Sequence, residues 1–98
     1  MMNYNEIANL AIQNNWSIKT SSTKPITSLY NPDATYEILI ANKGSLSEVS
    51  VKKRTSVISD IVLEGPTIVN DRDLLHYVKK YIDQYSNMPQ DVIGGGGY

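Results

Sequence analysis

Residues 35–54, TYEILIANKGSLSEVSVKKR, constrain the fold more than any other part of the chain. Two runs rich in β-branched and aromatic residues flank Asn42-Lys43-Gly44-Ser45, and apolar and polar residues alternate along both runs. This pattern predicts a β-hairpin, because alternation places one set of side chains on one face of a sheet. A four-residue loop over 42–45 sets Ile38 opposite Val49.

A third strand is predicted directly after the hairpin, in TSVISDIVLEGP, with its end at Gly65-Pro66. A connection over residues 54–56 sets Val49 opposite Ile61, so that Ile38, Val49 and Ile61 form one row across an antiparallel meander. In this register the apolar side chains of all three strands project from the same face of the sheet. That face is formed by Tyr36, Ile38, Ile40, Val49, Val51, Val57, Ile61 and Leu63.

Two helices are predicted to flank the meander. Residues 71–85 have apolar side chains at helical spacing, with Asn70 placed to cap the first turn. Residues 3–13 predict a shorter amphipathic helix that ends at Asn14-Asn15.

The segment between the first helix and the hairpin gives weaker signals. Residues 16–21 alternate in polarity, which predicts a short strand or an extended arm. Residues 20–35 are rich in turn-forming residues and contain Pro25 and Pro32, so they predict a long irregular connection.

These elements predict an α+β fold in a single small domain over residues 1–88. The order is α-β-β-β-(β)-α, and an antiparallel meander of three or four strands packs against the C-terminal helix. This order of elements resembles that of double-stranded-RNA-binding domains and of small phage-encoded inhibitors. The resemblance is limited to the architecture, because the RNA-binding domains begin their second helix with lysines and this chain has Asp71 and Asp73 there. Residues 89–98, which end in GGGGY, predict a flexible tail, with Tyr98 as an alternative carboxyl-terminal handle for a partner.

Composition and motifs exclude several classes of function. The chain has no cysteine and a net charge of −1, so no disulfide, no thiolate metal site and no strong general attraction to nucleic acid are expected. His76 is the single histidine, and no phosphate-binding, metal-ligating or nucleophile motif accompanies it. We therefore expect no cofactor, no metal and no enzymatic activity. No apolar run approaches the length of a membrane span. The sequence contains no cysteine and no recognisable secretory signal, which favours a cytoplasmic location.

The second face of the predicted sheet is the candidate binding site. It carries an apolar group, Leu39, Leu46, Ile58 and Val62, with Lys52 and Arg54 at its rim. Two explanations compete: the N-terminal helix, or Trp16 with the 20–35 segment, covers this face, or the face binds a protein partner or a second copy of the chain.

The leading functional hypothesis is a non-enzymatic protein-interaction module in which Lys52 and Arg54 set the register of the contact. Its small size and its abundance of residues with AT-rich codons point to a phage or mobile-element accessory or inhibitor protein. One alternative is a nucleic-acid-binding accessory protein that uses Lys52, Arg54 and tyrosines, although acidic residues interrupt any basic groove. A small enzyme built around His76 is the other alternative.

Overall fold

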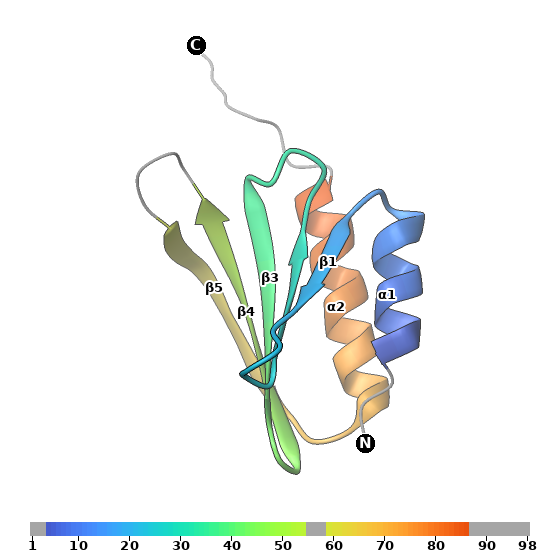
Figure 1. Ribbon diagram of the computed structural model, residues 1–98, viewed down its shortest axis with the longest axis vertical. Helices are drawn as coiled ribbons and strands as arrows, with labels where there is room; N and C mark the ends of the chain where they lie inside the picture. The colour runs from blue at the N-terminus through green and yellow to red at the C-terminus, as the bar shows by residue number, and fades with distance from the viewer. Residues whose placement is uncertain (1–3, 55–58, 87–98) are drawn as a thin grey trace.

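The computed structural model describes residues 4–54 and 59–86, which form one antiparallel sheet with two helices on one of its faces (Figure 1). The chain runs through α1 (Tyr4–Gln13), β1 (Ser17–Thr20), β2 (Ile26–Tyr30), β3 (Tyr36–Lys43), β4 (Leu46–Arg54), β5 (Ser59–Ile68) and α2 (Asp71–Ser86). The strands lie in sequence order, β1-β2-β3-β4-β5, and each pairs with its neighbour along the chain. The predicted α+β class, the antiparallel meander and the packing against a C-terminal helix are confirmed.

The sheet has five strands because β2 lies inside the segment that was expected to be irregular. Pro25 directly precedes this strand and Pro32 follows it, so the two prolines bound a strand instead of preventing one. Within β2, Thr27, Ser28 and Leu29 are buried. Thr27 and Leu29 lie on the helix side of the sheet and Ser28 on the other side. This strand is short and polar, but it is held between β1 and β3.

The hairpin between β3 and β4 turns over two residues, not four. Lys43 pairs with Leu46, and Gly44 between them has φ 75°, the left-handed conformation expected at the first position of a type II′ turn. Ile38 therefore pairs with Val51, and the predicted pairing with Val49 is wrong. The error is two residues, so each side chain keeps its predicted face.

Two β-bulges between β4 and β5 change which side chains of β5 face the core. Val51 pairs with Leu63 but Lys52 pairs with Ile61, so Val62 is an extra residue in β5. Ile61 consequently turns away from the helices, and 53% of its surface is exposed. The predicted row of Ile38, Val49 and Ile61 is therefore wrong, and the observed core row is Ile18, Leu29, Ile38, Val51 and Leu63.

The second bulge lies between Glu48 and Ser50 of β4 and allows β5 to continue past its predicted end. The strand passes through Gly65 and Pro66 and ends at Ile68, which is buried. A proline fits here because β5 is an edge strand and its outer side needs no N–H donor.

Both helices pack on the same side of the sheet. The inner side of α2 is formed by Leu74, Val78, Tyr81, Ile82 and Tyr85. The ring of Tyr85 lies 4.8 Å from that of Tyr36 on β3, measured between centroids. The helix α1 buries Ile7 and Ala11 and contacts α2 and β1 (Figure 1). It ends as predicted, with Asn15 at φ 65°.

The following residue, Trp16, is buried, and its indole N–H donates a hydrogen bond to the hydroxyl of Ser86 at the end of α2. These contacts fix α1 beside α2 on one face of the sheet. The explanation in which the N-terminal helix or Trp16 covers the other face is therefore wrong. Neither described helix combines the length and the apolar character needed to cross a membrane.

Candidate functional site: the open face of the sheet

We use the name open face for the side of the sheet that is turned away from α1 and α2. No described helix packs on it (Figure 1). Its middle is a row of directly paired residues, one from each strand from β1 to β5, which we call the central row: Lys19, Ser28, Leu39, Ser50 and Glu64. This row adjoins the aliphatic core row along every strand, so its side chains project to the opposite face.

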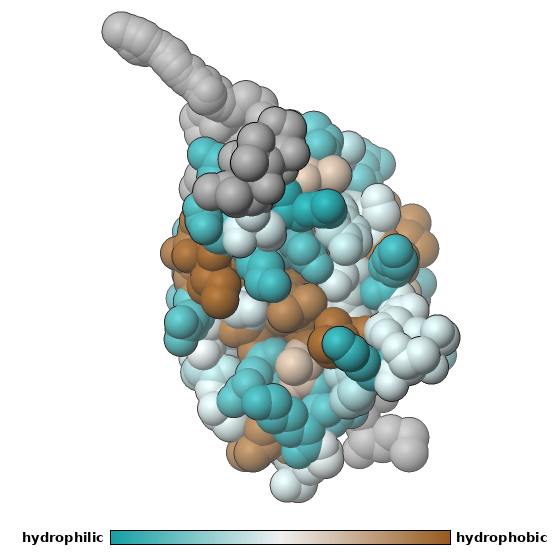
Figure 2. Space-filling model, turned by 60° about the vertical axis from the view of Figure 1, so that its left-hand side comes forward, coloured by the Kyte–Doolittle hydropathy of each residue, from teal (hydrophilic) through white to brown (hydrophobic). Residues whose placement is uncertain are grey.

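Two further rows flank the central row. The upper row contains Ser17, Tyr30, Glu37, Lys52 and Ile61, and the lower row contains Ile26, Ala41, Glu48 and Thr67. Aliphatic side chains thus lie among charges of both signs. Seen from the side that carries β5, hydrophobic patches are separated by hydrophilic residues (Figure 2).

The four apolar residues predicted to form the binding centre are not brought together. Leu39 lies in the middle of the open face and is half-buried. Val62 is the bulge residue of β5, with 47% of its surface exposed and no directly paired residue on β4. Leu46 lies at the turn, four residues along β4 from Ser50, a separation of about 13 Å. Ile58 lies outside the described residues.

The companions of Leu39 on the open face are Ala41 and Ile61. Ala41 was overlooked because a single small residue adds little to an apolar pattern. Ile61 was assigned to the core because a regular alternation places it there, and the bulge reverses its direction. The run Ile61-Val62-Leu63 contains no polar residue to show which member breaks the alternation.

The two predicted rim cations lie where the register expected them, on the open face near the end of β4. The guanidinium carbon of Arg54 lies 5.2 Å from the centroid of the Tyr30 ring, within the range of a cation–π contact. Lys52 is directly paired with Glu37 on one side and Ile61 on the other. Arg54 therefore already has an aromatic neighbour, and Lys52 lies beside a carboxylate in the register of the sheet.

The open face has two shallow hollows, one on each side of Leu39. The hollow over β3, β4 and β5 has a volume of about 440 Å³ and is lined by Leu39, Ala41, Glu48, Val49, Ser50, Ile61, Glu64, Gly65 and Thr67. The hollow over β1 and β2 has a volume of about 370 Å³ and is lined by Lys19, Thr20, Ser21, Ser22, Ile26, Ser28 and Tyr30. Both hollows are partly open to solvent, and aliphatic, polar and charged side chains line each of them.

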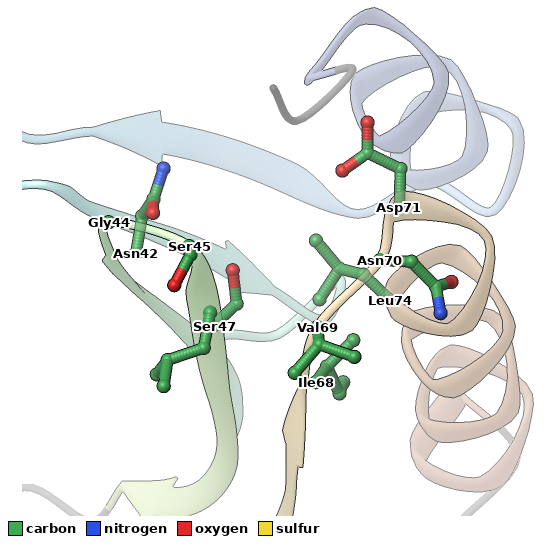
Figure 3. A pocket seen from close by; sticks show the side chains of 10 residues that line it. Asn42, Gly44, Ser45, Ser47, Ile68, Val69, Asn70, Asp71 and Leu74 are labelled. Carbon is green, nitrogen blue, oxygen red and sulfur yellow. The ribbon is translucent and has the colours of Figure 1, made fainter.

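A further pocket of about 320 Å³ lies between the β3–β4 turn and the start of α2 (Figure 3). The turn contributes Asn42, Ser45 and Ser47, and the helix start contributes Asn70 and Asp71. The side chain of Asn70 is already engaged in capping α2, because its Oδ1 accepts a hydrogen bond of 2.8 Å from the Asp73 N–H. The Asp71 carboxylate makes this helix start unfavourable for an anion.

The titratable side chains of α2 include one histidine and three tyrosines. His76 is exposed and meets the ring of Tyr77 edge-on at 5.4 Å between centroids. Burial raises the pKa of Tyr81 and of Tyr85 above the ordinary value, with smaller contributions from neighbouring tyrosines. Within residues 4–54 and 59–86, no three histidine or carboxylate side chains gather in a way that could hold a metal ion.

The tail that carries Tyr98 lies outside the described residues. Comparisons with protein-family models, with curated proteins and with solved structures find no significant match.

Proposed function

We propose that this chain is a non-enzymatic protein-interaction module that binds through the open face of its sheet. The observation that carries the proposal is the combination of Leu39, Ala41 and Ile61 with charges of both signs on a sheet face that no described helix covers. A one-sided sheet that only contacted water would present polar side chains there. Apolar side chains inside a charged rim are typical of surfaces that bind other proteins.

A role as an accessory or inhibitor protein of a phage or mobile element is the finer form of this proposal. Small size and abundant residues with AT-rich codons support it. The mode of action would be steric: the sheet face covers a surface of the target, and charges fix the orientation.

A second function, nucleic-acid binding through Lys52 and Arg54, has weaker support. The Glu37 carboxylate is directly paired with Lys52, and Glu48 and Glu64 lie on the same face. A phosphate backbone would meet these carboxylates together with the cations, which weakens binding.

Two adjacent residues of β3 test whether the open face is a surface and not a core. Leu39 projects onto the open face, whereas Ile38 is fully buried under α2. We expect Leu39→Asp to keep its far-UV circular dichroism and to melt within a few degrees of the wild type. We expect Ile38→Asp to be unfolded, because an unpaired charge in the core costs several kcal/mol. Equal loss of structure in both variants would contradict an open face.

Photo-crosslinking tests whether the face binds protein. A photoreactive amino acid replaces Ser50 on the open face, and the matched control replaces Ile12, which is exposed on α1. In cells that express the chain, we expect position 50 to give a covalent protein adduct that Leu39→Asp removes, and position 12 to give none. The proposal fails if position 50 yields no more adduct than position 12.

A further inference from the structure

We propose that the partner on the open face is a second copy of this chain, related by a two-fold axis that runs nearly parallel to β3. The inference rests on the proposed function, because it names the occupant of the same surface. It follows from the order of residues in the central row, which is self-complementary.

The central row reads Lys19, Ser28, Leu39, Ser50, Glu64 from β1 to β5. A two-fold axis along β3 exchanges β1 with β5 and β2 with β4. Leu39 then packs on Leu39 of the second copy, and each Ser28 meets a Ser50. At both ends of the row, Lys19 of one copy faces Glu64 of the other, so the apolar contact is central and an ion pair closes each side.

Lys19 and Glu64 are free to make these pairs. Both side chains are exposed, and neither has a salt-bridge partner among the described residues. They lie on the two edge strands, so no intramolecular contact between them is available across a sheet about 19 Å wide. Association is the step that brings the two charges together.

Within the central row, the charges favour this direction of the axis. An axis in the interface perpendicular to the strands, at the level of the central row, would place Glu64 against Glu64 and Lys19 against Lys19. Like charges facing each other oppose association, whereas the axis along β3 pairs the opposite charges at the two ends of the central row. Two sheets stack about 10 Å apart with their strands rotated by about 30°, and the long side chains of lysine and glutamate can span the resulting offset.

The flanking rows contribute both favourable and unfavourable contacts in this arrangement. In the upper row, Tyr30 faces Lys52 of the second copy, a favourable pairing of an aromatic ring with a cation. Glu37 lies on the axis and faces Glu37 of the second copy. In each chain Lys52 is the residue directly paired with Glu37. In the lower row Ala41 packs on Ala41, and Ile26 faces Glu48, whose carboxylate already pairs with Lys43 of its own chain. The contact is confined to one face of a sheet about 19 Å wide, and we expect a dissociation constant in the micromolar range.

Charge reversal at the two ends of the central row tests the proposal. We expect the wild type to sediment as a dimer at about 100 µM and as a monomer at high dilution. In a dimer of the Lys19→Glu variant, two carboxylates face each other at both ends of the central row. In a dimer of the Glu64→Lys variant, two ammonium groups face each other at both ends. Each variant should dimerise at least about tenfold more weakly than the wild type.

Mixing the two variants provides the decisive measurement. In a mixed dimer both end contacts are again opposite in charge, so the mixture should recover dimers that contain one chain of each kind. Lys79→Glu, a charge reversal on an exposed position of α2, serves as the control and should dimerise as the wild type does. A monomeric wild type at 100 µM, or a mixture that stays monomeric, would overturn the proposal.

The photoreactive residue at position 50 gives a second readout that does not depend on the reversed charges. We expect an adduct with twice the mass of the chain, in which position 50 is joined to the peptide of a second copy that contains Ser28. An adduct with a different protein alone would overturn the dimer and leave the proposed function standing. No adduct above the position 12 control would contradict both.

Discussion

At the scale of single residues, Gly65 shows how closely α2 approaches the sheet. A Cβ atom at this position would lie 2.7 Å from the backbone oxygen of Val49 and 2.9 Å from the hydroxyl oxygen of Tyr81. Both distances are shorter than van der Waals contact. A residue without a side chain is therefore what allows Tyr81 to lie over β5 next to the second bulge.

We expect Gly65→Ala to lower the stability by about 1–3 kcal/mol, because either the strand or the helix must move to accept the methyl group. Thermal unfolding followed by circular dichroism measures the loss. The double variant Gly65→Ala/Tyr81→Phe should recover part of it, since removing the hydroxyl relieves one of the two contacts while the Val49 oxygen stays in place. An unchanged melting temperature in Gly65→Ala would contradict the close approach.

At the scale of the elements, the start of α2 depends on an N-terminal cap by Asn70, which the sequence predicts. The Asn70 Oδ1 accepts a hydrogen bond from the Asp73 N–H, and the Asn70 Nδ2 donates one of 3.0 Å to the Asp73 carboxylate. These bonds satisfy an N–H group that has no partner within the helix. They explain why the helix begins at Asp71, as the spacing predicted.

We expect Asn70→Ala to destabilise the protein by about 1 kcal/mol, with a fall in melting temperature of about 4–8 °C for a domain of this size. Asn70→Ser is the matched control, because a serine hydroxyl can also cap a helix, and it should lie close to the wild type. Equal melting temperatures for the alanine and serine variants would show that the cap adds nothing to stability.

Elements with strict periodicity were predictable from the sequence, and departures from periodicity were not. The helix α2 and the pairing of β3 with β4 follow from repeats that continue over many residues. The position of Ile61 depends on a bulge, which arises from how β5 fits against β4 and α2 and leaves no clear local signal. The strand β2 is not predictable in the same way, because prolines indicate an interruption in a sequence, whereas Pro25 and Pro32 here mark the boundaries of a strand.

The candidate site was predictable as a face but not as a set of residues. Leu39, Lys52 and Arg54 lie on the open face because the two-residue error in the hairpin preserved the alternation. The self-complementary central row could not be predicted, since it needs β2 and the bulges to bring Lys19 and Glu64 to the same level. Such long-range registers depend on the whole sheet.

At the scale of the whole molecule, the packing of α2 on the sheet makes stability sensitive to alkaline pH. Burial raises the pKa of Tyr81 and Tyr85 above 10.0, so the folded protein holds both phenols in their neutral form more strongly than the unfolded chain does. This contribution is complete below pH 10 and is lost as the pH rises through the pKa values of the folded state.

We therefore expect the free energy of unfolding to fall above pH 10, with unfolding coupled to the appearance of tyrosinate absorbance near 295 nm. Tyr81→Phe and Tyr85→Phe remove one ionisable group each and should flatten the decline. A stability that is unchanged between pH 9 and pH 11.5 would contradict the burial of these two hydroxyl groups in the folded state.

The two edges of the sheet differ in a way that bears on aggregation. The edge strand β1 is four residues long, and the longer edge strand β5 is interrupted by two bulges and by Pro66. Neither edge offers the long, regular row of N–H and C=O groups that another chain needs in order to extend a sheet. The molecule can therefore expose aliphatic side chains on one face of its sheet without offering an edge at which further strands could add.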